Sequence, residues 1–192
     1  LGTFGWKTIF IFLTICGISC IILSYFTIPD TKEPDKTIKI SNALKRYFGI
    51  LHDKNFVICA LSGSLIMSGL FAYITSSPFA YLKFFGLPPK EYSIIFSINS
   101  IGFITASQIN AQLLKRFPVR KVLEKSLLIP FISGISLIFI GINYPDFWIF
   151  SIAVFVFISS IGAITPCTTA LALSNQTKHS GSASALLGSI QF

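Results

Sequence analysis

Charged side chains are scarce in this sequence. Only 11% of the residues are Asp, Glu, Lys or Arg and 53% are hydrophobic, whereas charged residues make up about 25% of a typical soluble domain. Five apolar stretches have no charged residue or histidine in their interiors, and each is close to the roughly 20 residues that a helix needs to cross a bilayer. This composition excludes a water-soluble globular domain and predicts an all-α polytopic membrane protein in a lipid bilayer. The predicted spans are residues 6–28, 55–82, 91–114, 125–144 and 147–173.

Groups that could carry out catalysis or bind a metal are missing from these stretches. The histidines, His52 and His179, fall in predicted connections, and no carboxylate lies in the interior of a span to form an acid–base pair or a proton relay. The cysteines all lie in apolar stretches, where a thiol behaves as a small apolar group, so we expect no disulfide. Cys16 and Cys20 share a helix face, but no His or carboxylate lies at that depth to complete a metal shell. We therefore expect neither an enzyme nor a metal or cofactor site.

The ends of the sequence also lack features of a complete membrane protein. It begins with Leu1 rather than Met, and the first span has neither a basic leader nor a small-residue cleavage site, so we do not expect a signal peptide. A sixth apolar stretch starts near Gly181 and reaches Phe192 after 12 residues. At about 1.5 Å per residue, that is too short to cross the hydrocarbon core. We expect the chain to be a piece of a longer protein.

Basic residues are concentrated on one side of the predicted spans. The net charge of +8 could indicate nucleic-acid binding, but the 15 basic residues follow the connections and form no patch. Twelve lie in the first, third and fifth connections and three on the opposite side, which is the positive-inside pattern. We therefore expect no nucleic-acid partner and place the odd-numbered connections in the cytoplasm. The twelve are Lys32, Lys36, Lys39, Lys45, Arg46, Lys54, Lys115, Arg116, Arg120, Lys121, Lys125 and Lys178, and the three are Lys7, Lys83 and Lys90.

The longest polar segment, residues 29–54, separates the first two spans, and we interpret it as a cytoplasmic linker. Ser41 can cap a short amphipathic helix within it. This pattern fits a helix on the membrane surface, and it fits equally well a solvated connector with incidental amphipathicity. The apolar face of the helix would hold Leu44, Tyr47, Phe48 and Leu51, and the polar face Lys45 and Arg46.

Small residues recur every four positions in the second span. Side chains of this size let two helices approach closely, so we interpret the stripe as a face that packs against a neighbouring helix. Gly63 and Gly69 narrow the same helix further. The stripe consists of Ser64, Ser68, Ala72, Ser76 and Ala80.

Polar side chains are most frequent in the third span, where they form two nearly opposite faces. Polar groups at membrane depth are costly, which makes them candidates for a substrate pathway, and amides there also bond neighbouring helices. The sequence leaves open which face lines a cavity and which bonds a neighbour. One face holds Asn99, Gly102, Ala106 and Asn110, and the other Ser97, Thr105, Gln108 and Gln112.

Aromatic residues are abundant, with 20 Phe, six Tyr and two Trp. Several lie beside serines in the outer half of the second span. An apolar, aromatic cavity with a few hydroxyl and amide groups suits lipophilic substrates, although a single Phe can equally face lipid. The candidate cavity residues, chosen for polarity or aromaticity and for depth, are Asn99, Gln108, Phe71, Tyr73 and Ser77.

Three segments carry a resemblance to a known family. Ser68–Leu82 reads SGLFAYITSSPFAYL, Ser97–Phe117 reads SINSIGFITASQINAQLLKRF, and Gly181–Phe192 reads GSASALLGSIQF. Together they resemble the Bcr/CflA family of bacterial multidrug exporters within the major facilitator superfamily. The resemblance covers nearly the whole chain, which then corresponds to helices six to ten and the start of helix eleven of a twelve-helix transporter.

The resemblance implies two six-helix bundles that hold substrate between them near the midplane and alternate access by rocking. It implies export of lipophilic drug-like molecules in exchange for protons across the bacterial inner membrane. Residues 1–192 would be an incomplete C-terminal half, and residues 29–54 would be the linker between the halves. The proton-coupling carboxylate is then expected in the missing N-terminal half, which would be a partner of this chain.

The basic turn after the third span resembles the C-terminal copy of the superfamily's cytoplasmic gating motif. In the family, this motif braces the inward-closed state through charges and helix ends. Phe117 and Pro118 depart from it, because a glycine is usual near this position. The matching residues are Asn110, Lys115, Arg116, Arg120 and Lys121.

Two other functions stay open. A nutrient or metabolite carrier would share the fold, but the lack of fixed charge in the candidate cavity favours neutral or cationic lipophiles over anionic metabolites. A split or decayed gene product without transport of its own belongs to a different class. An intact, in-frame flanking coding sequence would exclude it.

Overall fold

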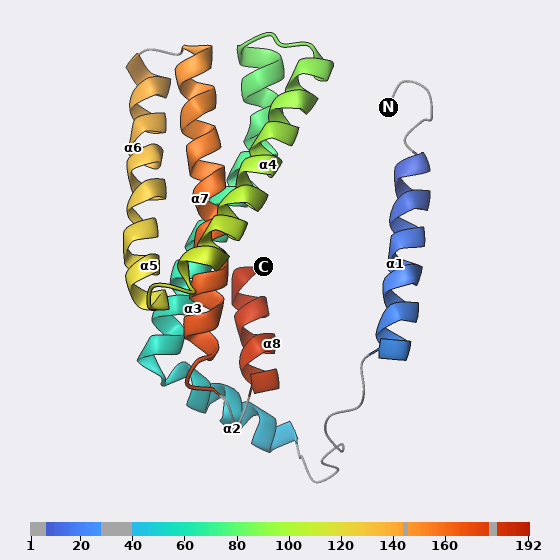
Figure 1. Ribbon diagram of the computed structural model, residues 1–192, viewed down its shortest axis with the longest axis vertical. Helices are drawn as coiled ribbons and strands as arrows, with labels where there is room; N and C mark the ends of the chain where they lie inside the picture. The colour runs from blue at the N-terminus through green and yellow to red at the C-terminus, as the bar shows by residue number, and fades with distance from the viewer. Residues whose placement is uncertain (1–6, 28–39, 144–145, 177–179) are drawn as a thin grey trace. The chain divides into compact units, whose positions relative to one another are not determined.

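The computed structural model describes residues 7–27, 40–143, 146–176 and 180–192 (Figure 1). The regular elements in these ranges are all helices, which confirms the predicted all-α fold. The chain divides into two units, Leu1–Lys39 and Ile40–Phe192. The linker before Ile40, together with Lys178 and His179, lies outside the described residues.

The first unit contains one helix, α1 (Lys7–Thr27), among its described residues. Its 21 residues extend about 30 Å at about 1.5 Å each, which matches the hydrocarbon core of a bilayer. None of its side chains is buried. Because a helix satisfies its own backbone hydrogen bonds, such a segment can present apolar side chains to lipid on every side.

The five predicted spans are confirmed, since five helical segments are long and apolar enough to cross a membrane. The fourth differs most from its expected bounds, because α5 (Val119–Ser126) and α6 (Leu128–Asn143) form one crossing, Val119–Asn143. Pro118 precedes α5 in an extended conformation. The basic residues expected in a connection therefore lie partly on a helix, with Val122 and Leu123 buried on its other side.

The second span is longer than expected because α3 (Lys54–Pro78) continues as a π-helical segment, η1 (Phe79–Phe84). Proline has no N–H to donate, so the regular hydrogen-bond pattern cannot pass through Pro78 unchanged. After it, Phe85 N donates to Ala80 O at 3.0 Å, a wider spacing than in an α-helix. The turn then closes at Gly86, whose φ of 67° favours glycine.

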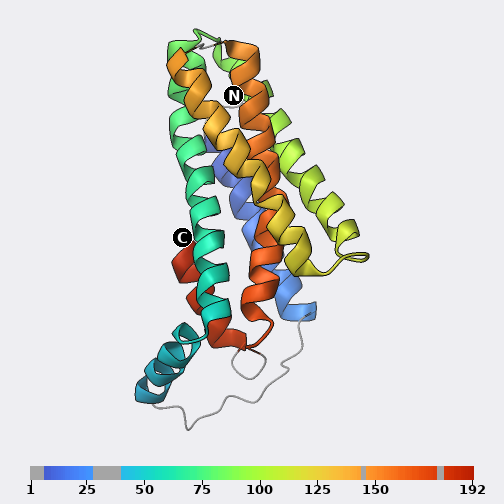
Figure 2. The same cartoon turned by 90° about the vertical axis from the view of Figure 1, so that its left-hand side faces the viewer.

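The second unit is built around α7 (Phe147–Leu173), which packs against α3, α4 (Pro89–Leu113), α5 and α6. Figures 1 and 2 show these helices side by side as a bundle. The short helices α2 (Ile40–Leu51) and α8 (Ser180–Gln191) pack together and against α3 at the end where α3 begins. Ser41 lies inside α2 rather than at its cap.

Glycines carry the closest helix contacts. A Cβ at Gly162 of α7 would overlap the carbonyl oxygen of Phe103 on α4, and a Cβ at Gly102 would overlap Phe155 and Ser159. On α3, a Cβ at Gly69 would lie 2.7 Å from the ring of Phe157. Helices α3 and α4 can therefore approach α7 this closely only because glycine has no side chain, as in other membrane bundles.

No described helix packs on the middle of the small-residue stripe of α3, where Ser68, Ala72 and Ser76 are exposed. Helix α7 approaches α3 on the side of Gly69, which is about 100° around the helix from Ser68. The serine hydroxyls bond their own helix instead, and Ser76 Oγ donates to Ala72 O at 2.5 Å. The outer part of the stripe lines a pocket.

Candidate functional site

Two side-chain hydrogen bonds join α3 to α4. Asn99 Nδ2 donates to Tyr73 Oη at 2.8 Å, and Ser77 Oγ lies 3.0 Å from Tyr92 Oη. Asn99 is 2% exposed and Ser77 is 4% exposed. Both helices pack on α7, so these bonds fix their spacing on the surface of that central helix. Polar pairs of this kind are typical links between helices in lipid.

An apolar pocket of about 260 Å³ lies beside the Tyr73–Asn99 bond; we call it the α3–α4 pocket. The rings of Tyr73 and Phe96 are stacked in its wall, 5.8 Å apart and 15° from parallel. Ile158 of α7 also contributes to the lining. The lining is neutral and mostly hydrocarbon. It consists of Leu70, Tyr73, Ile74, Phe96, Asn99, Ser100, Phe103, Ile104 and Ile158.

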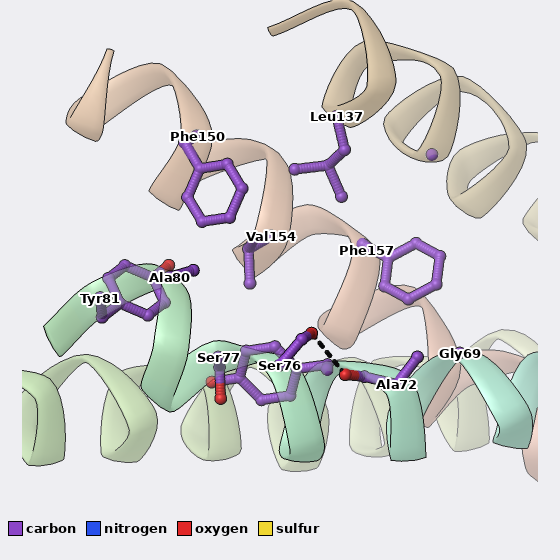
Figure 3. A pocket seen from close by; sticks show the side chains of 12 residues that line it. Gly69, Ala72, Ser76, Ser77, Ala80, Tyr81, Leu137, Phe150, Val154 and Phe157 are labelled. Atoms are coloured by element: carbon purple, nitrogen blue, oxygen red, sulfur yellow. Dashed lines mark hydrogen bonds between the residues drawn. The ribbon is translucent and has the colours of Figure 1, made fainter. Parts of the chain in front are cut away.

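A second pocket, the α3–α6 pocket, has a volume of about 300 Å³ and also includes Tyr73 and Ser77 in its lining. Figure 3 shows Phe150, Val154 and Phe157 of α7 facing the small residues of α3, with Leu137 of α6 beside them. No charged side chain contributes to either pocket. Tyr73 therefore lies in the wall between two uncharged, aromatic-lined hollows.

Aromatic rings fill the bundle at the end where α3 runs into η1. Tyr81 is fully buried, and its ring lies 5.7 Å from that of Phe150, 5.9 Å from that of Tyr92 and 6.2 Å from that of Phe147. Edge-to-face and tilted pairs at these distances are favourable ring geometries. This cluster closes the α3–α6 pocket at the end away from the basic turn.

The hydroxyls of Tyr81 and Ser151 are both buried, and neither has a hydrogen-bond partner among the described residues. An unpaired buried hydroxyl lowers stability by about 1 kcal/mol or more. We expect Tyr81→Phe to raise the thermal unfolding midpoint of the complete transporter in detergent. Tyr73→Phe, which removes a bonded hydroxyl, should lower it. A midpoint that falls equally in both variants would contradict this assignment.

The five predicted cavity residues separate into two groups. Asn99, Tyr73 and Ser77 come together at the α3–α4 contact. Phe71 and Gln108 do not join them. The Phe71 side chain is 46% exposed and meets the ring of Phe192 edge to face at 6.1 Å, whereas Gln108 is exposed on another side of α4.

The two polar faces of α4 have different surroundings. The face with Asn99, Gly102 and Asn110 is buried against α3 and α7. The opposite face, with Ser97, Thr105, Gln108 and Gln112, is exposed. The buried face thus bonds neighbouring helices within this bundle. An exposed polar face on a membrane span favours contact with water or with further protein rather than lipid.

The predicted gating residues do not form one cluster. Asn110 is 1% exposed and its Nδ2 donates to Cys167 Sγ at 3.4 Å in the α4–α7 contact. The cations Lys115, Arg116, Arg120 and Lys121 are exposed instead. Arg120 pairs with Glu124 at 3.1 Å, an exposed pair on one helix that contributes roughly 0.5 kcal/mol or less.

The turn that carries these cations needs no glycine. Lys115 N donates to Gln112 O at 3.2 Å and Phe117 N to Leu113 O at 2.9 Å. Among the described residues, the one with positive φ is Gly86, far from this turn. Phe117 and Pro118 therefore fit the turn without backbone strain, although they depart from the family pattern.

Sequence reasoning missed Tyr92 and Phe96, which bond or stack with Ser77 and Tyr73. Tyr92, Phe96 and Asn99 lie at positions i, i+4 and i+7 of one helix, so they share a face. That spacing was the signal that could have identified them. Their partners on the second span are not recognisable from spacing, because they depend on how two helices meet.

The arrangement described so far is that of a polytopic membrane protein built from a bundle of apolar helices. Residues 1–192 match the family model of the Major Facilitator Superfamily, and the chain belongs to this superfamily. The fold and the neutral pockets between its helices agree with that class.

Two curated relatives align with almost the whole chain. It is 28% identical over 191 residues to a bicyclomycin resistance protein homolog of Haemophilus influenzae, which covers 98% of this chain and 48% of that protein. It is 30% identical over 185 residues to the uncharacterized MFS-type transporter YdgK of Bacillus subtilis, which covers 95% and 46%. The chain thus spans about half the length of these relatives. The resemblance to Bcr/CflA transporters is confirmed by this similarity.

Proposed function

We propose that this chain is part of a bacterial exporter that moves lipophilic, drug-like molecules out of the cell in exchange for protons. The observation that carries the proposal is the pair of neutral, aromatic-lined pockets on either side of Tyr73. Apolar linings with a few fixed polar groups bind lipophilic ligands and orient them by one or two hydrogen bonds. The bicyclomycin resistance homolog among the relatives supports the same substrate class.

The lining chemistry favours this function over a carrier of anionic metabolites. An anionic substrate brought to membrane depth would need a cation or several donors to replace its hydration. Neither pocket has a Lys, Arg or His in its lining. The stacked Tyr73 and Phe96 rings instead offer planar apolar area, and the Asn99 amide offers directional hydrogen bonding.

Proton coupling belongs to a part of the transporter beyond the residues described. Within the described spans, the acidic residues are Glu91, in the first turn of α4, and Glu124, which is exposed on α5 and paired with Arg120. No Asp or Glu therefore lies near the middle of a span, and a proton carrier at membrane depth is normally a carboxylate or histidine. We place the coupling carboxylate in the rest of the transporter, which makes up about half of the relatives' length. The exposed polar face of α4 is our candidate for the surface that meets that part.

We also propose that the protein resides in the inner membrane, with its basic turns in the cytoplasm. The turn after α4 and the helix α2 lie at the same end of the bundle (Figure 1), and the basic residues of the sequence are concentrated there. The exposed cations of this turn, Lys115, Arg116, Arg120 and Lys121, are then available to brace the other half when the cytoplasmic side is closed. Residues 29–54 would link the two halves.

The test is accumulation of a fluorescent lipophilic cation in cells that express the complete coding sequence containing this chain. We expect lower dye content than in cells with an empty vector, and we expect a proton uncoupler to restore it. Membrane insertion is confirmed by immunoblotting of the membrane fraction. Unchanged dye content despite correct insertion would reject export of this class of molecule. Export that resists the uncoupler would reject the proton coupling alone.

A further inference from the structure

The helix α2 is fixed to the bundle at its C-terminal end. Ile50 is 2% exposed and packs with Phe56 and Ala60 of α3 and with Ala183 and Leu187 of α8. The last turn of α2 therefore cannot swing freely away from the membrane-crossing helices. Figure 1 shows α2 beyond the end of the bundle where α3 begins, at a steep angle to α3.

The elbow between α2 and α3 is short and held by hydrogen bonds. Asp53 caps α3, with Oδ1 accepting from Asn55 N at 2.9 Å. Its other oxygen accepts from Gln176 Nε2, after the end of α7, at 2.9 Å. The span begins at Lys54, directly after this cap. Because two residues separate α2 from that span, α2 lies at the depth where lipid headgroups meet water.

Two apolar side chains in the last two turns of α2 are exposed. Phe48 is 64% exposed and Leu51 is 42% exposed. At about 100° per residue they lie about 60° apart, on a side of the helix that does not include Ile50. Arg46 lies almost opposite the midpoint between them. The helix thus has an edge against the bundle, an uncovered apolar side and a polar side.

We propose that α2 lies in the lipid–water interface of the membrane, with Phe48 and Leu51 inserted among the lipid chains. The depth of α2 is set by the adjoining span, and both side chains keep a large exposed area beside the described helices. An amphipathic helix at that depth places its apolar side in the acyl boundary and its polar side in water. The occupant of the apolar side is therefore lipid rather than a second protein surface.

This position makes α2 an anchor for one end of the bundle. Through Ile50 it is joined to the start of α3 and to α8, and both would be held at a constant depth while the transporter changes access. The inference depends on the membrane location of the helices and not on the identity of the transported molecule. A failure of the drug-export proposal would therefore leave this inference unaffected.

The test is the depth of nitroxide labels in the complete transporter, reconstituted in lipid nanodiscs in a cysteine-free background. Phe48→Cys places a label on the apolar side, and Gly49→Cys places one on the polar side. Gly49 is a suitable control because nothing lies within 4 Å of a Cβ at this position. Leu51→Cys is a second label on the apolar side.

Collisions with oxygen report contact with lipid, and collisions with a water-soluble nickel chelate report contact with water. We expect the ratio of oxygen to nickel collisions to be several-fold higher at positions 48 and 51 than at position 49. Equal ratios at the three positions would overturn the proposal in favour of a solvated connector. Protection of positions 48 and 51 from both reagents would also overturn it, because a protein surface would then cover them.

Discussion

The transporter is expected to lose much of its stability when Gly162 is replaced by alanine. Gly162 lies where α7 crosses α4, and a Cβ there would overlap the carbonyl oxygen of Phe103. A backbone oxygen cannot turn aside as a side chain can, so the helices would have to separate along the α4–α7 contact. Overpacking in a close-packed interior costs about 1–3 kcal/mol and occasionally more, and we expect Gly162→Ala at the upper end of that range.

The measurement is the thermal unfolding midpoint of the purified complete transporter, together with its elution profile in detergent. Gly141→Ala is the matched control, because it makes the same change in α6 where nothing lies within 4 Å of the added Cβ. That control should keep the wild-type midpoint. A Gly162→Ala protein as stable as the Gly141→Ala protein would show that α4 and α7 do not cross as closely as described.

The consequences of such a change should extend beyond the crossing itself. Helix α4 is joined to α7 further along by Asn110 and Cys167, and to α3 by Asn99 and Tyr73. A shift of α4 would therefore disturb both the buried amide–thiol pair and the α3–α4 pocket. In this fold, the closest backbone contact and the candidate binding region share one helix.

The number and position of the spans could be predicted from the sequence because lipid imposes a simple requirement. A segment that crosses hydrocarbon must be apolar, helical and about 20 residues long, and α1, α3, α4 and α7 agree closely with the expected bounds. The start of the fourth span could not be predicted in this way. Arg120, Lys121 and Lys125 lie on α5. From sequence alone, a short charged helix at the membrane surface cannot be distinguished from a polar connecting loop.

Which faces of the helices meet could not be predicted from composition. The serine and alanine stripe of α3 has the pattern of a packing face, yet Gly69 makes the contact with α7 and Ser76 faces a pocket. The two polar faces of α4 are equally rich in amides, and only the placement of α3 and α7 distinguishes Asn99 from Gln108. Face selection is a tertiary property, because apolar side chains suit both lipid and protein surroundings.

Removal of the Asn99–Tyr73 hydrogen bond is expected to have the largest effect on transport. With Asn99→Ala, Tyr73 Oη loses the donor that lies 2.8 Å away, and the ring is no longer held against Phe96. We expect about a ten-fold loss of export, which corresponds to about 1.4 kcal/mol and to one hydrogen bond at a buried site. Tyr73→Phe should cause a similar loss, measured as the initial rate of dye efflux from preloaded cells.

The two substitutions act on the same bond, so their effects should not add. The Asn99→Ala, Tyr73→Phe double variant is expected to export at nearly the rate of either single variant, because neighbours that share one interaction are coupled. Asn143→Ala is the matched control, since its amide bonds the carbonyl of Phe139 within its own helix at an exposed position. It should export normally. Additive losses at equal membrane abundance would mean that Asn99 and Tyr73 act independently. The hydrogen bond between them would then not be what maintains the α3–α4 pocket for transport.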